Sequence, residues 1–178
     1  VAIEAVRLSG EAQNAVSELA NSARRIGEVV ELIKGKRFKK AAAAPRRIHQ
    51  RVSLKLATKL YTFLEGQKCQ VYEAPFDVRF TDGPKEDRKI RDVVQPDICV
   101  ICDPDKLDDR GCIGAPDLIV EILSPGNNKM ELKYKYELYE SFGVREYWII
   151  NPESQNLIIY TLVDGKYVPS RLLTSGDV

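Results

Sequence analysis

The chain is poor in several of the features that assign a function at once. It has a single histidine and four cysteines, and its formal net charge of +1 identifies no partner. No apolar run approaches the ~20 residues that a membrane-spanning helix needs, and no signal peptide is recognisable. We therefore expect a cytoplasmic protein that spans no membrane.

The cysteines do not form the pattern of a metal or redox motif. Cys99 and Cys102 fall in or beside a buried strand, where residues three apart point to opposite faces. This argues against a zinc knuckle and a thioredoxin-like motif. We expect free thiols in a reducing compartment, and the cysteines concerned are Cys69, Cys99, Cys102 and Cys112.

The order of the predicted elements is mixed α and β. The length predicts one domain over 1–178. Helices are predicted over 11–25, 45–65 and 129–142. Strands are predicted over 29–33, 36–41, 70–80 with an interruption at Pro75, 93–102, 115–123 and 145–151. Polar loops are expected over 81–92 and 103–114, and a C-terminal β-hairpin turns at Asp164-Gly165. The β-α-β unit over 117–150 predicts a right-handed crossover and a parallel pair of strands.

Two acidic residues stand against or inside short apolar runs. Pro96-Asp97 leads into Ile-Cys-Val-Ile, and Glu121 is embedded in Leu-Ile-Val-Glu-Ile-Leu. Such runs are typical of strands buried on both faces. A carboxylate in that place is costly unless it is paired or holds a metal, so Asp97 and Glu121 together indicate a site for a hard divalent cation. Asp117, at the start of the second run, is better explained as a turn or edge residue.

The helix predicted over 129–142 offers one lysine to the core side. At 100° per residue, Lys135 falls within its apolar face, whereas Lys133 falls among Glu137 and Glu140. A half-buried lysine needs a partner, and Asp97 and Glu121 are the candidates. The alternative is a lysine whose stem packs while its charged end reaches solvent.

The N-terminal third is basic and carries two further candidate residues. Residues 24–59 contain twelve Lys or Arg and two acids, which suits a polyanion or simply a solvated surface. His49 lies beside the apolar stripe of the helix over 45–65, and a structural role is as well supported as a catalytic one. Glu31 lies in an apolar strand and either faces solvent or walls the same site. The apolar stripe comprises Ile48, Val52, Leu56, Leu60 and Phe63.

Several segments, taken jointly, resemble the bacterial putative restriction endonuclease family that is abundant in cyanobacteria, a branch of the PD-(D/E)XK nuclease superfamily. The segments are VVELIKGKRF, APFDVRF, VVQPDICVICDP, GAPDLIVEILSPGN and KYELYESFGVREYWIINPE. The resemblance covers about residues 24–165, and residues 1–20 contribute little to it. It implies an α/β (α+β) fold with a restriction-endonuclease-like mixed sheet flanked by helices.

The resemblance also implies a site and a reaction. Pro96-Asp97 and Glu121 match the two acids of the superfamily, while Leu123 stands where its lysine is usual and Lys135 matches the lysine moved to the following helix. Glu31 corresponds to the early acid, and His49 matches a position that is commonly histidine.

The implied cofactor is Mg²⁺ (or Mn²⁺), held by Asp97, Glu121 and the backbone carbonyl of Ile122. The implied contacts to the nucleic-acid backbone come from basic residues: Lys39, Arg46, Arg47 and Arg51, and further along the chain Lys85, Arg88, Lys89 and Arg91.

Three readings of the function follow. The first is a metal-dependent endonuclease that hydrolyses phosphodiester bonds, with DNA as the expected substrate. The second is a catalytically silent module on the same fold that binds nucleic acid or protein, which the displaced lysine leaves open. The third is metal-dependent chemistry on another phosphate ester, or a structural role. Cutting both strands of a duplex needs two active sites, which a homodimer would supply.

Overall fold

A computed structural model of the chain describes residues 28–33, 36–41, 45–81, 92–125 and 129–174. The predicted helix over 11–25 and the basic residues expected in the loop over 81–92 (Lys85, Arg88, Lys89 and Arg91) lie outside these ranges. Within them, no helix is long and apolar enough to cross a lipid bilayer.

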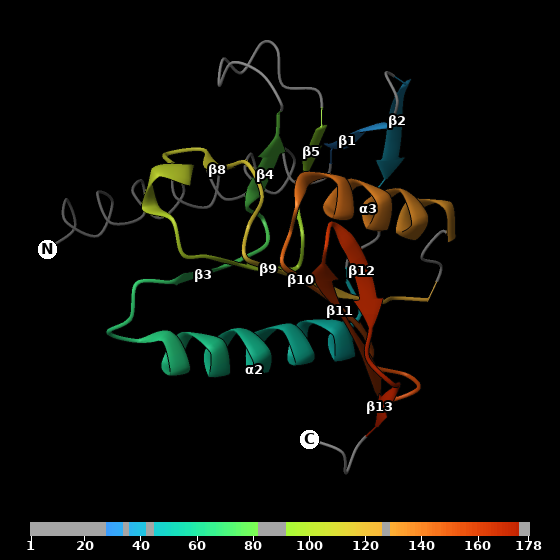
Figure 1. The fold of residues 1–178 in the computed structure, drawn as a ribbon. Coiled ribbons are helices and arrows are strands. Elements are labelled where there is room, and N and C mark those ends of the chain that lie inside the picture. The colour runs from blue at the N-terminus through green and yellow to red at the C-terminus, as the bar shows by residue number, and fades with distance from the viewer. Residues whose placement is uncertain (1–27, 34–35, 42–44, 82–91, 126–128, 175–178) are drawn as a thin grey trace, which may run out of the picture.

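A seven-stranded mixed sheet and two helices form the framework of the described residues (Figure 1). The strand order is β12-β11-β10-β9-β6-β3, with β13 paired to β11. The strands are β3 (Gln70–Glu73), β6 (Ile98–Ile101), β9 (Leu118–Ile122), β10 (Glu146–Asn151), β11 (Asn156–Val163), β12 (Lys166–Pro169) and β13 (Leu173–Thr174). The mixed α and β architecture expected from the sequence is confirmed.

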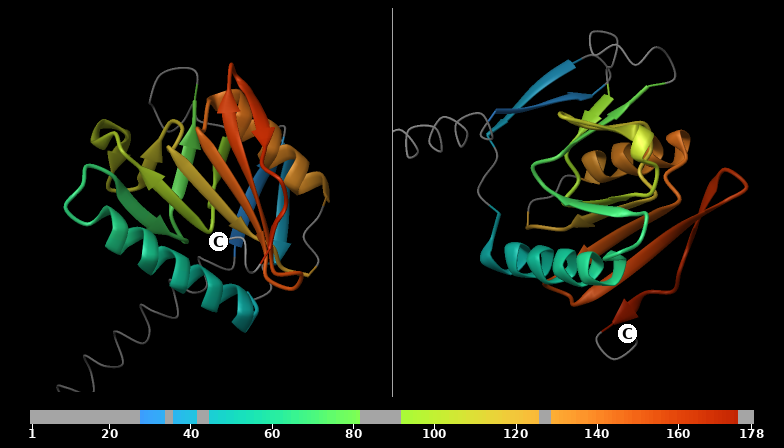
Figure 2. Two further views of the ribbon diagram at one scale, coloured as in Figure 1. Left: turned by 60° about the horizontal axis from the view of Figure 1, so that its bottom comes forward. Right: turned by 90° about the vertical axis from the view of Figure 1, so that its left-hand side faces the viewer.

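The helices α2 (Arg47–Leu64) and α3 (Lys129–Phe142) cover opposite faces of this sheet (Figures 1 and 2). Each central strand alternates its side chains between these faces. The α2 side contains Ile98, Val120 and Ile122, with Val52, Leu56 and Leu60 of the helix packed against them. The α3 side contains Cys99, Ile119, Leu138, Tyr139 and Tyr147. The sheet is therefore buried on both faces, as the continuous apolar runs predicted.

The apolar stripe predicted on α2 is correct only in its middle. Ile48 is 44% exposed and Phe63 is 71% exposed, because they lie in the first and last turns of the helix, away from the packed centre.

The β-α-β unit and the C-terminal hairpin are confirmed. β9 and β10 pair in parallel across α3. β11 and β12 pair antiparallel around Asp164 and Gly165, which both have positive φ, as a two-residue hairpin turn requires. Near the N-terminus, β1 (Glu28–Ile33) and β2 (Lys36–Ala41) form the expected antiparallel pair.

A second, four-stranded sheet corrects two sequence predictions. Its order is β5-β4-β8-β7, and its strands are β4 (Asp77–Phe80), β5 (Asp92–Val94), β7 (Leu107–Asp108) and β8 (Gly111–Ile113). The interruption predicted at Pro75 is confirmed, and it divides residues 70–80 between the two sheets. The single strand predicted over 93–102 is wrong, because it is divided between the same two sheets at Pro96. Proline lacks the N–H that a continuous ladder requires, so it divides a strand. The loop predicted over 103–114 contains β7, β8 and a 3-10 turn (Pro104–Lys106).

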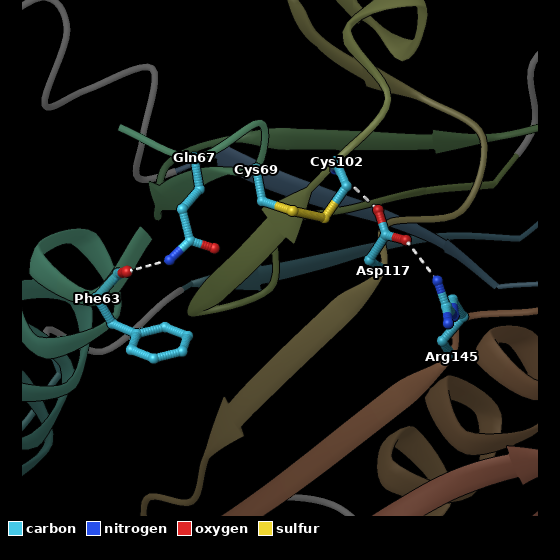
Figure 3. Close-up of a disulfide and its surroundings, with 6 residues drawn as sticks. All are labelled: Phe63, Gln67, Cys69, Cys102, Asp117 and Arg145. Atoms are coloured by element: carbon cyan, nitrogen blue, oxygen red, sulfur yellow. Dashed lines mark hydrogen bonds and ion pairs between the residues drawn. A yellow bond between two sulfur atoms is a disulfide. The ribbon is translucent and has the colours of Figure 1, made fainter. Parts of the chain in front are cut away.

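The expectation of four free thiols is wrong for two cysteines. Cys69 and Cys102 form a disulfide (Figure 3), whereas Cys99 and Cys112 are free and buried. The bonded residues flank the pairing of β3 with β6, whose last register pair is Gln70 and Ile101. The sheet register thus brings together two cysteines that are 33 residues apart in sequence, a separation that carries no pairing signal.

Candidate active site

The candidate site lies where β6 begins and β9 ends, between the two helices. Asp97 directly precedes β6, and Glu121 lies in β9. The antiparallel register pairs Ile98 with Val120, so Asp97 and Glu121 occupy the next opposed positions. His49 reaches this place from the first turns of α2, and Lys135 reaches it from α3. The structure therefore brings together four of the five residues predicted to be catalytic.

Asp97 is held from two directions. Its Oδ2 accepts a hydrogen bond from the backbone N–H of Ile122 at 2.6 Å. Its Oδ1 lies 3.2 Å from Nε2 of His49, and the two side chains are 21% and 12% exposed. The carboxylate is therefore oriented by a strand on one side and by a helix on the other.

Glu121 is almost fully buried and has a partner on each oxygen. Lys135 Nζ lies 3.0 Å from Oε2, and the hydroxyl of Tyr139 donates to Oε1 at 2.8 Å. Burial raises the pKa of Glu121, the charge of Lys135 opposes that rise, and the nearby charge of Asp97 adds to it. The two carboxylates thus interact, as expected of a pair that shares one site.

Lys135 is buried, with a side-chain exposure of 10%, and a second carboxylate, Glu131, lies 3.8 Å from its Nζ. Lys133, two residues earlier, is 76% exposed and pairs with Glu137 on the solvent side. The placement of the two lysines that the helical periodicity predicted is confirmed. The snorkelling alternative is wrong because Glu121 binds the lysine inside the protein.

His49 contacts both Asp97, which precedes β6, and the backbone of Ile122, in β9. The hydrogen bond to Asp97 raises the pKa of His49, and burial lowers it. The charge of Asp97, a hydrogen bond to the Ile122 backbone and the charge of Glu121 raise it further. The net direction is upward from 6.5, so the positively charged imidazole is favoured. Ile122 therefore connects Asp97 and His49 through its backbone.

The donor set fits a hard cation better than a soft one. Among the described residues, no three His, Cys, Asp or Glu side chains are grouped closely enough to hold a metal by themselves. Two adjacent carboxylates and a backbone carbonyl nevertheless match Mg²⁺, which is bound through one or two carboxylates and keeps several waters. Asp97, Glu121 and Ile122 are the residues that would supply those oxygens.

Other predicted residues lie outside this group. Asp117 accepts a hydrogen bond from the Cys102 N–H and pairs with Arg145 (Figure 3), which confirms it as an edge residue. Glu31, in β1, lies opposite Phe38 of β2. Lys39 is also in β2. The side chains of Glu31 and Lys39 lie outside the part of the chain that the structure describes.

The three arginines predicted to contact nucleic acid differ in their surroundings. Arg46 forms an ion pair with Glu153 at 3.0 Å. Arg47 and Arg51 are exposed on α2.

Tyr139 is the residue that the sequence reasoning missed. Its position on the apolar face of the helix over 129–142 indicated only packing. The available signal was its spacing: Tyr139 follows Lys135 by one helical turn, so both can reach one partner.

Comparison with known proteins identifies relatives of the chain. The family model Uma2, described as "Putative restriction endonuclease", matches residues 17–178. An uncharacterized protein of Synechocystis sp. is 24% identical over 113 residues, covering 63% of this chain and 56% of that protein. The chain thus spans little more than half the length of this relative.

A solved structure shows the same fold. It is the crystal structure of a protein from Anabaena variabilis described as a putative nuclease belonging to DUF820. It aligns with a TM-score of 0.64 at 19% identity, covering 83% of this chain and 77% of that one.

The protonation of His49 should depend on the charge of Asp97. His49 is the only histidine, so its imidazole resonances can be followed by NMR in the metal-free protein. We expect it to titrate above 6.5 and to titrate lower in Asp97→Asn, which loses the charged partner. Stability from this contact is then fully present below pH 6.5 and is lost as pH rises through the raised pKa. The exposed Asp109→Asn is the control, and a wild-type value at or below 6.5 would contradict the contact.

Removing the charge of Lys135 should destabilise the fold far more than removing that of Lys133. Lys135→Met leaves the buried Glu121 carboxylate unpaired, at a cost of about 3–5 kcal/mol near neutral pH. Because the folded-state pKa of Glu121 then rises further above 4.5, the cost shrinks as acid protonates it. Lys133→Met should change the unfolding free energy by less than about 0.5 kcal/mol. Urea unfolding at neutral and acidic pH measures both, and equal losses would refute the difference in environment.

Proposed function

The chain belongs to the Uma2 family of putative restriction endonucleases, and from this premise we propose that it is a metal-dependent endonuclease that hydrolyses phosphodiester bonds in DNA. One observation carries the proposal. Asp97, Glu121 and Lys135 come from three separate elements and meet at one end of the central sheet, with Lys135 Nζ 3.0 Å from Glu121. Two acids can hold the ion that assists phosphodiester hydrolysis, and a lysine can stabilise the charge that develops on the phosphate.

The acids and the Ile122 carbonyl would hold Mg²⁺ or Mn²⁺. Such an ion, when bound, stabilises charge on the phosphate and lowers the pKa of a coordinated water. Tyr139 and Lys135 keep Glu121 in a single orientation, since each binds one of its oxygens. Preorganised ligands of this kind need no rearrangement when the cation arrives.

Lys135 is proposed to have a second role toward the substrate. Leu123, which directly follows β9, stands where the superfamily has its lysine, and Lys135 supplies the positive charge from α3. A lysine at this place orients the attacking water or neutralises negative charge that develops on the phosphate. This assignment favours an active enzyme over the silent binding module.

His49 is proposed to position Asp97 and to face the same phosphate. A protonated imidazole beside Asp97 limits the rotation of that carboxylate and adds positive charge at the mouth of the site. Glu31 remains a candidate for its outer wall. The exposed Arg47 and Arg51 lie two residues before and two residues after His49 on α2, and they are proposed to bind the nucleic-acid backbone together with Lys39 and Arg46. A homodimer would cut both strands of a duplex.

Cleavage should require both acids and a divalent ion. We expect relaxation and linearisation of plasmid DNA with Mg²⁺ or Mn²⁺ and none with EDTA. Asp97→Ala and Glu121→Ala should each lower the cleavage rate by at least about 100-fold, while DNA affinity in EDTA stays unchanged. The control is Asp109→Ala, which removes an exposed carboxylate from another part of the surface. DNA binding without cleavage by the wild-type protein would instead support the silent module.

Lys135 should be needed for cleavage and not for metal binding. Lys135→Ala should abolish cleavage at a temperature where circular dichroism shows the variant folded. Its Mn²⁺ affinity, measured by titration calorimetry, should stay largely unchanged because the metal ligands remain. Lys133→Ala is the matched control and should cut normally. If Lys135→Ala cuts normally as well, Lys133 or Lys129 becomes the candidate.

A further inference from the structure

The outer face of α2 combines positive charge with exposed apolar side chains. The helix has 18 residues and no Asp or Glu. Arg47, Arg51 and Lys55 recur every four residues and are exposed. Within the described part of the chain none of the three has an ion pair. These charges are therefore available to an anion from solvent.

The same face carries two large side chains that the fold does not use. Leu54 is 63% exposed and Tyr61 is 62% exposed. They are seven residues apart, which places them one above the other on the helix. Thr58 lies between them and donates to the Leu54 carbonyl, so its hydroxyl is turned toward the backbone. Tyr61 is thus an open aromatic surface beside a basic stripe.

The position of α2 connects this face to the site. His49, in the first turn, contacts Asp97 on the inner side of the helix, and Arg47 and Arg51 flank it on the outer side. From there α2 runs along one face of the sheet toward β3 (Figure 2). The rise of 1.5 Å per residue puts Tyr61 about 21 Å from Arg47. A chain bound along the helix would therefore have one end beside the first turn of α2, which carries His49, the partner of Asp97.

We propose that the outer face of α2 binds an unpaired nucleic-acid strand and leads it to the Asp97–Glu121 site. Arg47, Arg51 and Lys55 contact successive phosphates, and Tyr61 stacks on a base. The inference rests on the proposed nuclease function, and it adds single strands and duplexes with an unpaired arm to the DNA substrates expected.

The basic side chains and the exposed Tyr61 ring together favour an unpaired nucleic-acid strand as the ligand of this face. Basic side chains that track a backbone, combined with aromatic side chains under the bases, are how proteins bind single strands. In a duplex the bases are already stacked on each other, so Tyr61 would gain nothing from its ring. A second copy of the chain fits poorly, because a two-fold contact would place like charges opposite each other.

The test compares strand types in EDTA, where no cleavage occurs. Fluorescence anisotropy with a labelled oligonucleotide and with its duplex gives the two affinities. Tyr61→Ser should weaken single-strand binding by about 5- to 100-fold and leave duplex binding unchanged. Tyr61→Phe keeps the ring and should bind like the wild type. The control is Val168→Ser, which alters a side chain 51% exposed on β12.

The basic residues are tested separately, by the salt dependence of single-strand binding. Arg51→Ala and Lys55→Ala should each lower the salt dependence of single-strand binding by about 0.7 in log K against log salt. Unaltered single-strand affinity in Tyr61→Ser would overturn the proposal, as would equal losses for both strand types. A change of that variant from dimer to monomer in ultracentrifugation, with binding unaltered, would overturn it in favour of self-association.

The cleavage assay keeps this inference distinct from the proposed function. If the wild-type protein cuts neither strand type but single-strand binding depends on Tyr61, the binding face stands and the nuclease proposal fails. If cleavage requires Asp97 but single-strand binding does not depend on Tyr61, the nuclease proposal stands and the proposed binding face fails.

Discussion

A carboxylate buried inside the central sheet determines how this fold is put together. Glu121 lies in a strand whose neighbours on that face are apolar, and an unpaired charge there would be prohibitively costly. Lys135 and Tyr139 lie one helical turn apart on α3, and each donates a hydrogen bond to one oxygen of this carboxylate. The register of β9 and the docking of α3 are thus coupled, because a shift of either would leave a charge in the core without a partner.

Asp97 imposes a similar constraint on the other helix, α2. It is bound by the Ile122 backbone and by His49, which belongs to α2. Both helices therefore meet the central strands at the same end of the sheet although they cover opposite faces. The charge of Asp97 raises the pKa of Glu121, and the charge of Lys135 opposes that rise. A divalent cation is the ligand that would relieve the remaining repulsion.

The sequence was sufficient where a single local rule decided the outcome. The apolar runs placed Asp97 and Glu121 on buried strands, and helical periodicity separated Lys135 from Lys133. It failed where contacts across the fold decide. The division of residues 93–102 at Pro96 between two sheets depends on which neighbours each half meets. The Cys69–Cys102 disulfide follows from the register of β3 with β6, which no local pattern encodes.

The position of Lys135 on a helix has a consequence that a lysine on the strand would not have. A lysine at position 123 would be fixed by the sheet itself, whereas Lys135 depends on the packing of α3. That packing rests on Leu138 and Tyr139, which are both buried against the sheet. The group proposed to stabilise the phosphate is therefore held by the same contacts that close the core. Substitutions that loosen α3 should consequently affect the stability and the chemistry of the site together, and Tyr139 is where the two requirements coincide.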